Sequence, residues 1–146
     1  MTQLEFTKGM TILSVTYPKF EVDQTTMEVW YSFFEDIRAD VFIAAVKSYV
    51  RNSKFAPTVN ELLSHCEESK VIILNDTLKL MYQQGYFHQG VDDNQAHRNY
   101  EKANQWIQYG TEPDWLKDDM RSYRRAQLNQ QGQLKYNLKD GDKDAV

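Results

Sequence analysis

The sequence predicts an all-α protein, with a small helical bundle at the N-terminus followed by a linker, a more extended helical C-terminal segment and a disordered tail. Three observations support this fold class. Apolar residues recur three and four positions apart through most of the 146 residues. Proline and glycine separate these periodic segments. The longest aliphatic run, residues 71–74, has no partner strand elsewhere in the sequence, so a sheet is not expected.

The first helix is predicted over residues 2–17 and ends at Tyr17-Pro18, because proline cannot continue a helix. Residues 18–22 form a loop. Asp23 is a candidate N-cap for the second helix, with Thr25 and Thr26 as alternatives.

The second helix carries a face dense in large apolar side chains. The residues fall at steps of three, one, three and three, which predicts core packing rather than a ligand site, because a small helical domain must bury large side chains to be stable. These residues are Met27, Trp30, Tyr31, Phe34 and Ile37, of which Trp30 and Phe34 are expected to be structural.

A third helix is predicted from Asp40, and it ends at the corner formed by residues 53–58. Pro57 interrupts the helix there and restricts the residue before it. Thr58 and Glu61 have the spacing of a capping box, which starts the fourth helix and predicts structural roles for Pro57, Thr58 and Glu61. The fourth helix runs to residue 69 and resumes over residues 71–84, with a kink or break between the two parts left open.

The second half of the chain begins with a glycine-containing linker. Residues 1–84 are predicted to form the N-terminal domain and residues 85–95 the linker, in which Tyr86 and Phe87 are expected to be exposed. Residues 96–128 form a helical partner-binding segment, with helices over 96–109 and 115–128. The polar residues 129–146 are predicted to be a disordered tail.

No motif in the sequence predicts catalysis. There is no phosphate-binding glycine loop, and His65, His88 and His97 match no standard metal spacing, so neither a cofactor nor a metal is expected. Because Cys66 is the one cysteine, no internal disulfide can form, and its side chain is predicted to be buried and inert. No signal peptide or transmembrane segment is recognised. We therefore predict a cytoplasmic interaction protein and not an enzyme.

The C-terminal segment holds the candidate partner-binding residues, which are large anchors and arginines in an otherwise polar stretch. The alternative is that the apolar anchors pack on each other or on the N-terminal domain. The predicted contact residues are Trp106, Tyr109, Trp115, Leu116, Met120, Tyr123, Arg121, Arg124 and Arg125.

The three arginines also allow a different function. Bound to phosphates, they would make the chain a DNA-binding regulator, although a solvated helix face is the simpler interpretation of the cluster. The formal net charge of -4 disfavours nucleic-acid binding by the chain as a whole.

One ordered series of residues resembles a known family over about residues 1–68. The series is Tyr17-Pro18-Lys19-Phe20, Trp30, Asp36-Ile37, Asp40-Val41, Ala44-Ala45-Val46, Tyr49-Val50 and Ser53 to Leu62. It resembles the N-terminal domain of the replicative-helicase loader and inhibitor family of phages that infect Bacillus-like hosts.

This resemblance implies a phage DNA replication protein that acts in the cytoplasm of an infected bacterial host. Such a protein binds the hexameric replicative DNA helicase, which the host or the phage encodes, and holds it inactive. It then delivers the helicase to the phage origin with an origin-binding protein. The resemblance also implies that the C-terminal part contacts the helicase, and the N-terminal domain is the expected contact for other replication proteins.

Overall fold

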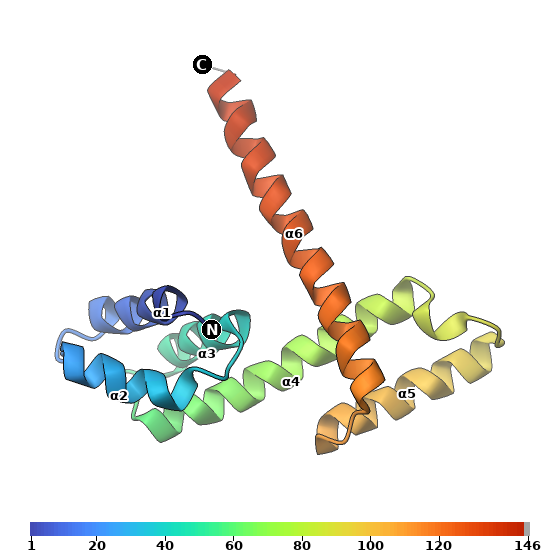
Figure 1. The fold of residues 1–146 in the computed structure, drawn as a ribbon, viewed down its shortest axis with the longest axis horizontal. Helices are drawn as coiled ribbons and strands as arrows, with labels where there is room; N and C mark the ends of the chain where they lie inside the picture. The colour runs from blue at the N-terminus through green and yellow to red at the C-terminus, as the bar shows by residue number, and fades with distance from the viewer. Residues whose placement is uncertain (145–146) are drawn as a thin grey trace. The chain divides into compact units, whose positions relative to one another are not determined.

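A computed structural model describes the backbone of residues 1–144 and the side chains of residues 1–130. Every regular element in the described backbone is helical, as the all-α prediction expects (Figure 1). In chain order the elements are α1 (Gln3–Thr16), α2 (Gln24–Phe34), α3 (Ala39–Asn52), α4 (Val59–Gln83), the 3₁₀ turn η1 (Tyr86–His88), α5 (Asp93–Tyr109) and α6 (Asp114–Asp144). The chain forms two compact units, Met1–Ile73 and Leu74–Val146, which divide inside α4.

The predicted helix starts are held by side-chain caps. The Asp23 carboxylate accepts from the backbone N–H of Thr26 at 2.7 Å, which confirms this residue as the N-cap of α2. The predicted capping box is also present, because Thr58 and Glu61 each accept from the other's backbone N–H. These bonds satisfy donors that the first turn of a helix otherwise leaves unpaired.

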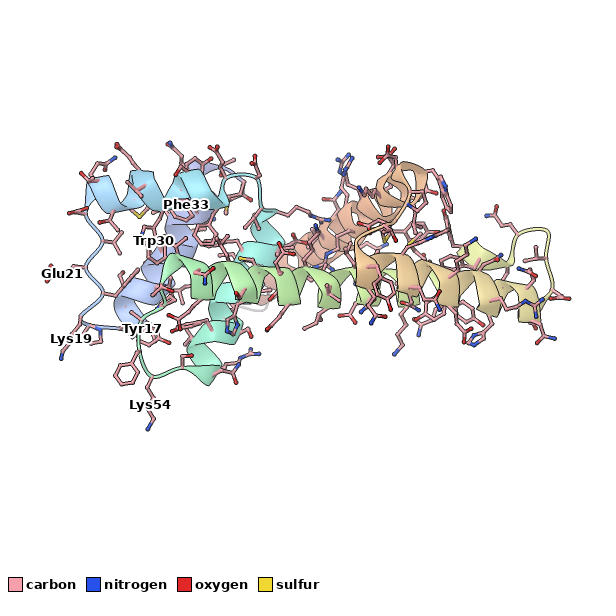
Figure 2. The ribbon with its side chains drawn as sticks, turned by 90° about the horizontal axis from the view of Figure 1, so that it is seen from below. Tyr17, Lys19, Glu21, Trp30, Phe33 and Lys54 are labelled. Atoms are coloured by element: carbon pink, nitrogen blue, oxygen red, sulfur yellow. The ribbon has the colours of Figure 1, made fainter. Side chains whose placement is uncertain are left out.

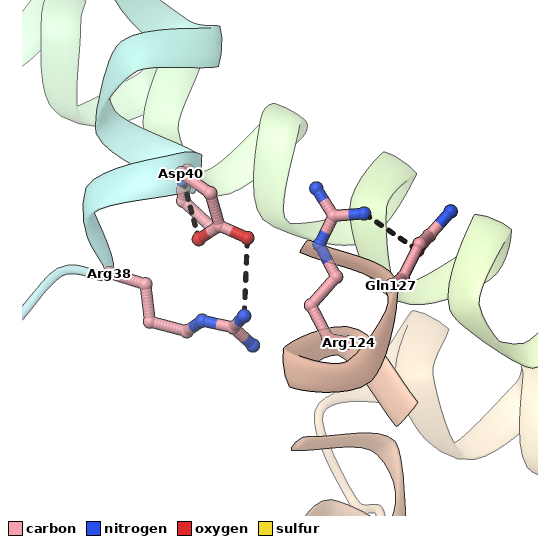
Figure 3. Close-up of polar contacts among 5 residues, drawn as sticks. Arg38, Asp40, Arg124 and Gln127 are labelled. Atoms are coloured by element: carbon pink, nitrogen blue, oxygen red, sulfur yellow. Dashed lines mark hydrogen bonds and ion pairs between the residues drawn. The ribbon is translucent and has the colours of Figure 1, made fainter. Parts of the chain in front are cut away.

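The third helix begins one residue earlier than predicted, at Ala39, and its N-cap residue Arg38 makes no side-chain cap bond. Instead, the Asp40 carboxylate accepts from the backbone N–H of Val41 at 2.9 Å and pairs with the Arg38 guanidinium at 3.1 Å (Figure 3). An acidic side chain in the first turn also interacts favourably with the helix dipole.

Aromatic rings form the centre of the N-terminal core. The centroids of Phe6 and Phe34 each lie 5.3 Å from that of Phe42, and all three side chains are buried. Trp30 stacks on Phe34 at 6.2 Å from a half-buried position at the edge of this cluster. These rings contribute much of the apolar area that stabilises a unit of this size.

The fourth helix is continuous from Val59 to Gln83, so no break occurs near residues 68–70. Ser69 is buried and does not interrupt the helix. Residues 71–74 are helical, which confirms that they do not form a strand.

The predicted linker is shorter than expected, because α5 already begins at Asp93, where Asp92 caps it through the N–H of Gln95. The expectation that Phe87 is exposed is wrong. The 3₁₀ turn after Gly85 brings this ring into the C-terminal core, where it is buried, and Tyr86 is half-buried.

The disordered tail predicted for residues 129–146 lies largely outside the described residues. Side chains from residue 131 onward, and residues 145–146 entirely, are outside that part of the chain. The backbone of α6 runs to Asp144, and disorder of the tail stays a prediction.

Candidate partner-binding surface

The turn between α5 and α6 positions two strongly exposed aromatic residues, Tyr109 and Trp115. Gly110 has a φ of 66°, which favours glycine, and its N–H donates to the carbonyl of Ile107 at 3.2 Å. The N–H of Thr111 donates to the carbonyl of Trp106 at 2.8 Å. This pair of bonds is a Schellman motif, and Pro113 follows it and directly precedes α6, whose first turn donates to its carbonyl. The helix ends at Tyr109, followed by Gly110, as predicted.

Three aromatic side chains and one lysine surround this turn. Trp115 meets Trp106 edge to face, with ring centroids 6.0 Å apart, and the Lys102 ammonium lies 5.2 Å from the centre of the Trp106 ring. Tyr109 and Trp115 are 73% and 55% exposed, whereas Trp106 is half-buried. We call Lys102, Trp106, Tyr109 and Trp115 the α5–α6 surface.

The sequence interpretation missed Lys102. A signal was present, because Lys102 precedes Trp106 by four residues and therefore lies on the same helix face. A cation over an indole ring is attracted by the negative face of the ring and favours one orientation of the side chain.

Two predicted contact residues, Leu116 and Met120, lie in the core of the C-terminal unit and not on its surface. They are four residues apart on α6, so they share one face of the helix and pack with Leu78, Met81 and Ile107. In this fold they support the neighbouring surface residues and are not accessible to a partner.

Tyr123 continues the same buried stripe of α6. It is half-buried, and its ring meets that of Tyr86 edge to face at 5.9 Å. The Tyr86 hydroxyl donates to the Asp119 carboxylate, and burial together with this acceptor raises the pKa of Tyr86. Tyr123 is therefore part of an aromatic contact within the unit.

The three arginines are in different environments. Arg121 and Arg125 are exposed, and the guanidinium of Arg121 pairs with Asp118 at 3.4 Å. Arg124 is half-buried and donates to the side chain of Gln127 at 2.9 Å (Figure 3). Arg121 and Arg125 are therefore accessible on α6, further along the helix that begins beside Trp115.

The described residues show no sign of a reactive cysteine, a metal site or a membrane-spanning helix. Burial raises the pKa of the Cys66 thiol to about 12, so the nucleophilic thiolate is strongly disfavoured. Among residues 1–130, no three His, Cys, Asp or Glu side chains come together in a way that could hold a metal ion. Within the same part of the chain, no helix has the length and apolar character needed to cross a bilayer.

Comparison with known proteins gives one match. Residues 1–63 match the family model for the N-terminal domain of the phage helicase loader and inhibitor family. This match confirms the predicted resemblance of the N-terminal part to that family, and the matched segment covers α1, α2, α3 and the start of α4. No curated protein and no solved structure matches the chain.

Proposed function

We propose that this chain is a non-catalytic adaptor of phage DNA replication that binds the hexameric replicative helicase through the α5–α6 surface. It holds the helicase inactive until the complex reaches the phage origin, where the helicase is loaded with the help of an origin-binding protein. The family match of residues 1–63 supports an association with a replicative helicase, encoded by the host or by the phage.

The observation that carries the assignment of the surface is the exposure of Tyr109 and Trp115 beside a glycine turn. Tryptophan and tyrosine concentrate binding energy at protein interfaces, because each buries a large area while losing little rotamer freedom. The contacts of Trp106 with Trp115 and Lys102 hold the rings in place before binding. Pre-organisation of this kind reduces the entropy lost on association.

Exposed basic residues on the C-terminal unit are consistent with an acidic site on the partner. Lys102, Arg121 and Arg125 are exposed and basic, so they suit acidic side chains around an apolar site on the helicase. Inhibition requires that the adaptor binds the inactive state of the helicase more tightly than the active state. Loading then follows when the origin complex removes this preference.

The test is the affinity of the full chain for purified hexameric replicative helicases of host and phage, with native mass spectrometry of the complex. Tyr109→Ala combined with Trp115→Ala should raise the Kd by about 30-fold or more, because truncation of a hot-spot residue costs about 2 kcal/mol or more. Leu128→Ala, which truncates an exposed apolar residue of α6, is the control and should bind normally. Unchanged affinity of the double variant would contradict the proposal.

The alternative of a DNA-binding regulator receives less support from the arginine cluster. Arg121 pairs with Asp118, and Lys117 lies 3.9 Å from Asp114, so carboxylates accompany the basic residues along α6. Phosphate binding would have to displace these interactions. A gel shift at low salt with single- and double-stranded DNA distinguishes this alternative, since its affinity would fall steeply as salt is added.

A further inference from the structure

The loop between α3 and α4 exposes an aromatic residue on a well-held backbone. Phe55 is 81% exposed, although it lies next to buried elements of the N-terminal unit. Its neighbour Lys54 is exposed as well, and Figure 2 shows Lys54 projecting from the same end of the unit at which Tyr17 lies. We call residues 53–58 the Phe55 corner.

Two buried tyrosines fix this corner. The hydroxyl of Tyr17 donates to the carbonyl of Ser53 at 2.7 Å, and the hydroxyl of Tyr49 donates to the carbonyl of Phe55 at 2.8 Å. The two rings meet edge to face at 6.2 Å, and both belong to the N-terminal core. On the other side of Phe55, Pro57 is buried. The backbone that carries the Phe55 side chain is thus restrained from both sides.

The exposure of Phe55 has no structural benefit within the unit. A phenylalanine side chain gains about 1.5–3 kcal/mol when it is moved from water into an apolar environment. Phe6, Phe34 and Phe42 obtain this gain in the core, whereas Phe55 does not. A rigid loop that presents an exposed ring is instead suited to insert that ring into a pocket of a partner, with little ordering cost on binding.

Basic residues near the Phe55 corner indicate the charge expected on the partner. Residues 41–60 contain three basic residues and no acidic one, and the next acidic residue, Glu61, accepts from the N–H of Thr58 in the helix cap. Lys47, Arg51 and Lys54 are all exposed, and none of them forms an ion pair within the described side chains. The surface of a partner that complements Phe55 and these basic residues is an apolar pocket with an acidic border.

The α5–α6 surface has similar chemistry, since it combines the exposed rings of Tyr109 and Trp115 with the exposed Lys102. The two compact units therefore present the same kind of surface, one on each unit. A hexamer of identical subunits repeats each of its surface sites, so one hexamer could receive both surfaces on equivalent sites of different subunits. Two linked contacts raise the overall affinity by making the second binding event intramolecular.

We propose that the Phe55 corner is a second helicase-binding site, in which Phe55 enters an apolar pocket bordered by acidic residues. This inference rests on the proposed function. A protein pocket is favoured over single-stranded DNA because surfaces that bind single strands stack successive bases on several aromatic side chains. The corner offers one aromatic ring.

The experiment measures the Kd of the full chain for the same purified hexameric helicases. Phe55→Ala should weaken binding by about 30-fold, as expected for loss of an interface hot spot. Arg51→Glu combined with Lys54→Glu should slow association and flatten its dependence on salt. Because Phe55 is exposed, the Tm of Phe55→Ala should equal that of the unchanged protein, which excludes misfolding as the cause.

Phe33→Ala is the matched control, because Phe33 is also an exposed phenylalanine, at 56%, and lies at the opposite edge of the unit from Lys54 (Figure 2). It should bind normally. If Phe55→Ala also binds normally while Tyr109→Ala with Trp115→Ala does not, the corner is not a helicase contact and the proposed function stands. If the unchanged protein binds no helicase, both proposals fail. If Phe55→Ala loses binding to an oligothymidine strand instead, the corner is a nucleic-acid surface and this inference is overturned.

Discussion

Gly9 lies on α1 directly against the ring of Phe42, so that a Cβ atom at this position would overlap the ring. In an exposed helix, replacing glycine by alanine gains about 1 kcal/mol. In this core, the added methyl group should cost about 1–3 kcal/mol through overpacking, and the backbone or the Phe42 ring would have to move. We therefore expect Gly9→Ala to lower the free energy of unfolding, measured by urea denaturation.

Thr11→Ala, at an exposed position of the same helix, is the control for the stability that alanine gains from its higher helix propensity. It should leave stability unchanged or raise it slightly. A more stable Gly9→Ala protein would show that α1 and α3 do not approach as closely as described. From the sequence, Gly9 only weakens the prediction of the first helix, because the partner ring that requires a glycine belongs to Phe42, on a helix much further along the chain.

At the scale of helices, the starts of α1 and α2 depend on ionised carboxylates. Hydrogen bonds from the backbone and hydroxyl of Thr2 lower the pKa of Glu5, and those from Thr26 lower the pKa of Asp23. A depressed pKa stabilises the fold above the ordinary values of 4.5 and 3.8, and this stability is lost as the pH falls through the lower folded values. Stability should therefore fall between about pH 5 and pH 3.

Glu5→Gln combined with Asp23→Asn isolates this contribution, because glutamine and asparagine can keep the cap bonds without titrating. The fall in unfolding free energy between about pH 7 and pH 3, followed by circular dichroism in urea, should be smaller for this variant. Glu67→Gln combined with Glu68→Gln, on an exposed part of α4, controls for the loss of two negative charges. If the unfolding free energy falls equally in all three proteins, the capping carboxylates are not the cause of the acid destabilisation.

Capping residues are local, which explains why the sequence predicts most helix starts well. The roles of residues within α6 depend on a longer pattern. Leu116, Met120 and Tyr123 follow steps of four and three and form the buried stripe, whereas Trp115 lies one position off this stripe and is exposed. The spacing alone could have separated core from surface here. By contrast, the exposure of Phe55 could not be predicted, because it depends on hydroxyl groups of Tyr17 and Tyr49, which hold the backbone of the corner from outside it.

At the scale of the whole molecule, the two units have separate cores. Leu62 is fully buried among the residues of the N-terminal core and Leu78 among those of the C-terminal core, although both belong to α4. The sequence predicts a division after residue 84, because the glycines there suggest a linker, whereas the compact units divide at Ile73. Because α4 is continuous and contributes apolar residues to both cores, no glycine, proline or other local sequence feature marks the division.

Separate cores predict separate effects of core mutations. Leu62→Ala should destabilise the N-terminal unit by about 2–5 kcal/mol, and Leu78→Ala the C-terminal unit by a similar amount. Trp30 reports on the first unit and Trp106 with Trp115 on the second, so indole signals followed by NMR during urea unfolding distinguish them. Each substitution should shift its own transition and leave the other within about 0.5 kcal/mol, as for independent sites. Equal shifts of both transitions would show that α4 couples the units into one cooperative fold, and a helicase contact on one unit would then stabilise the other.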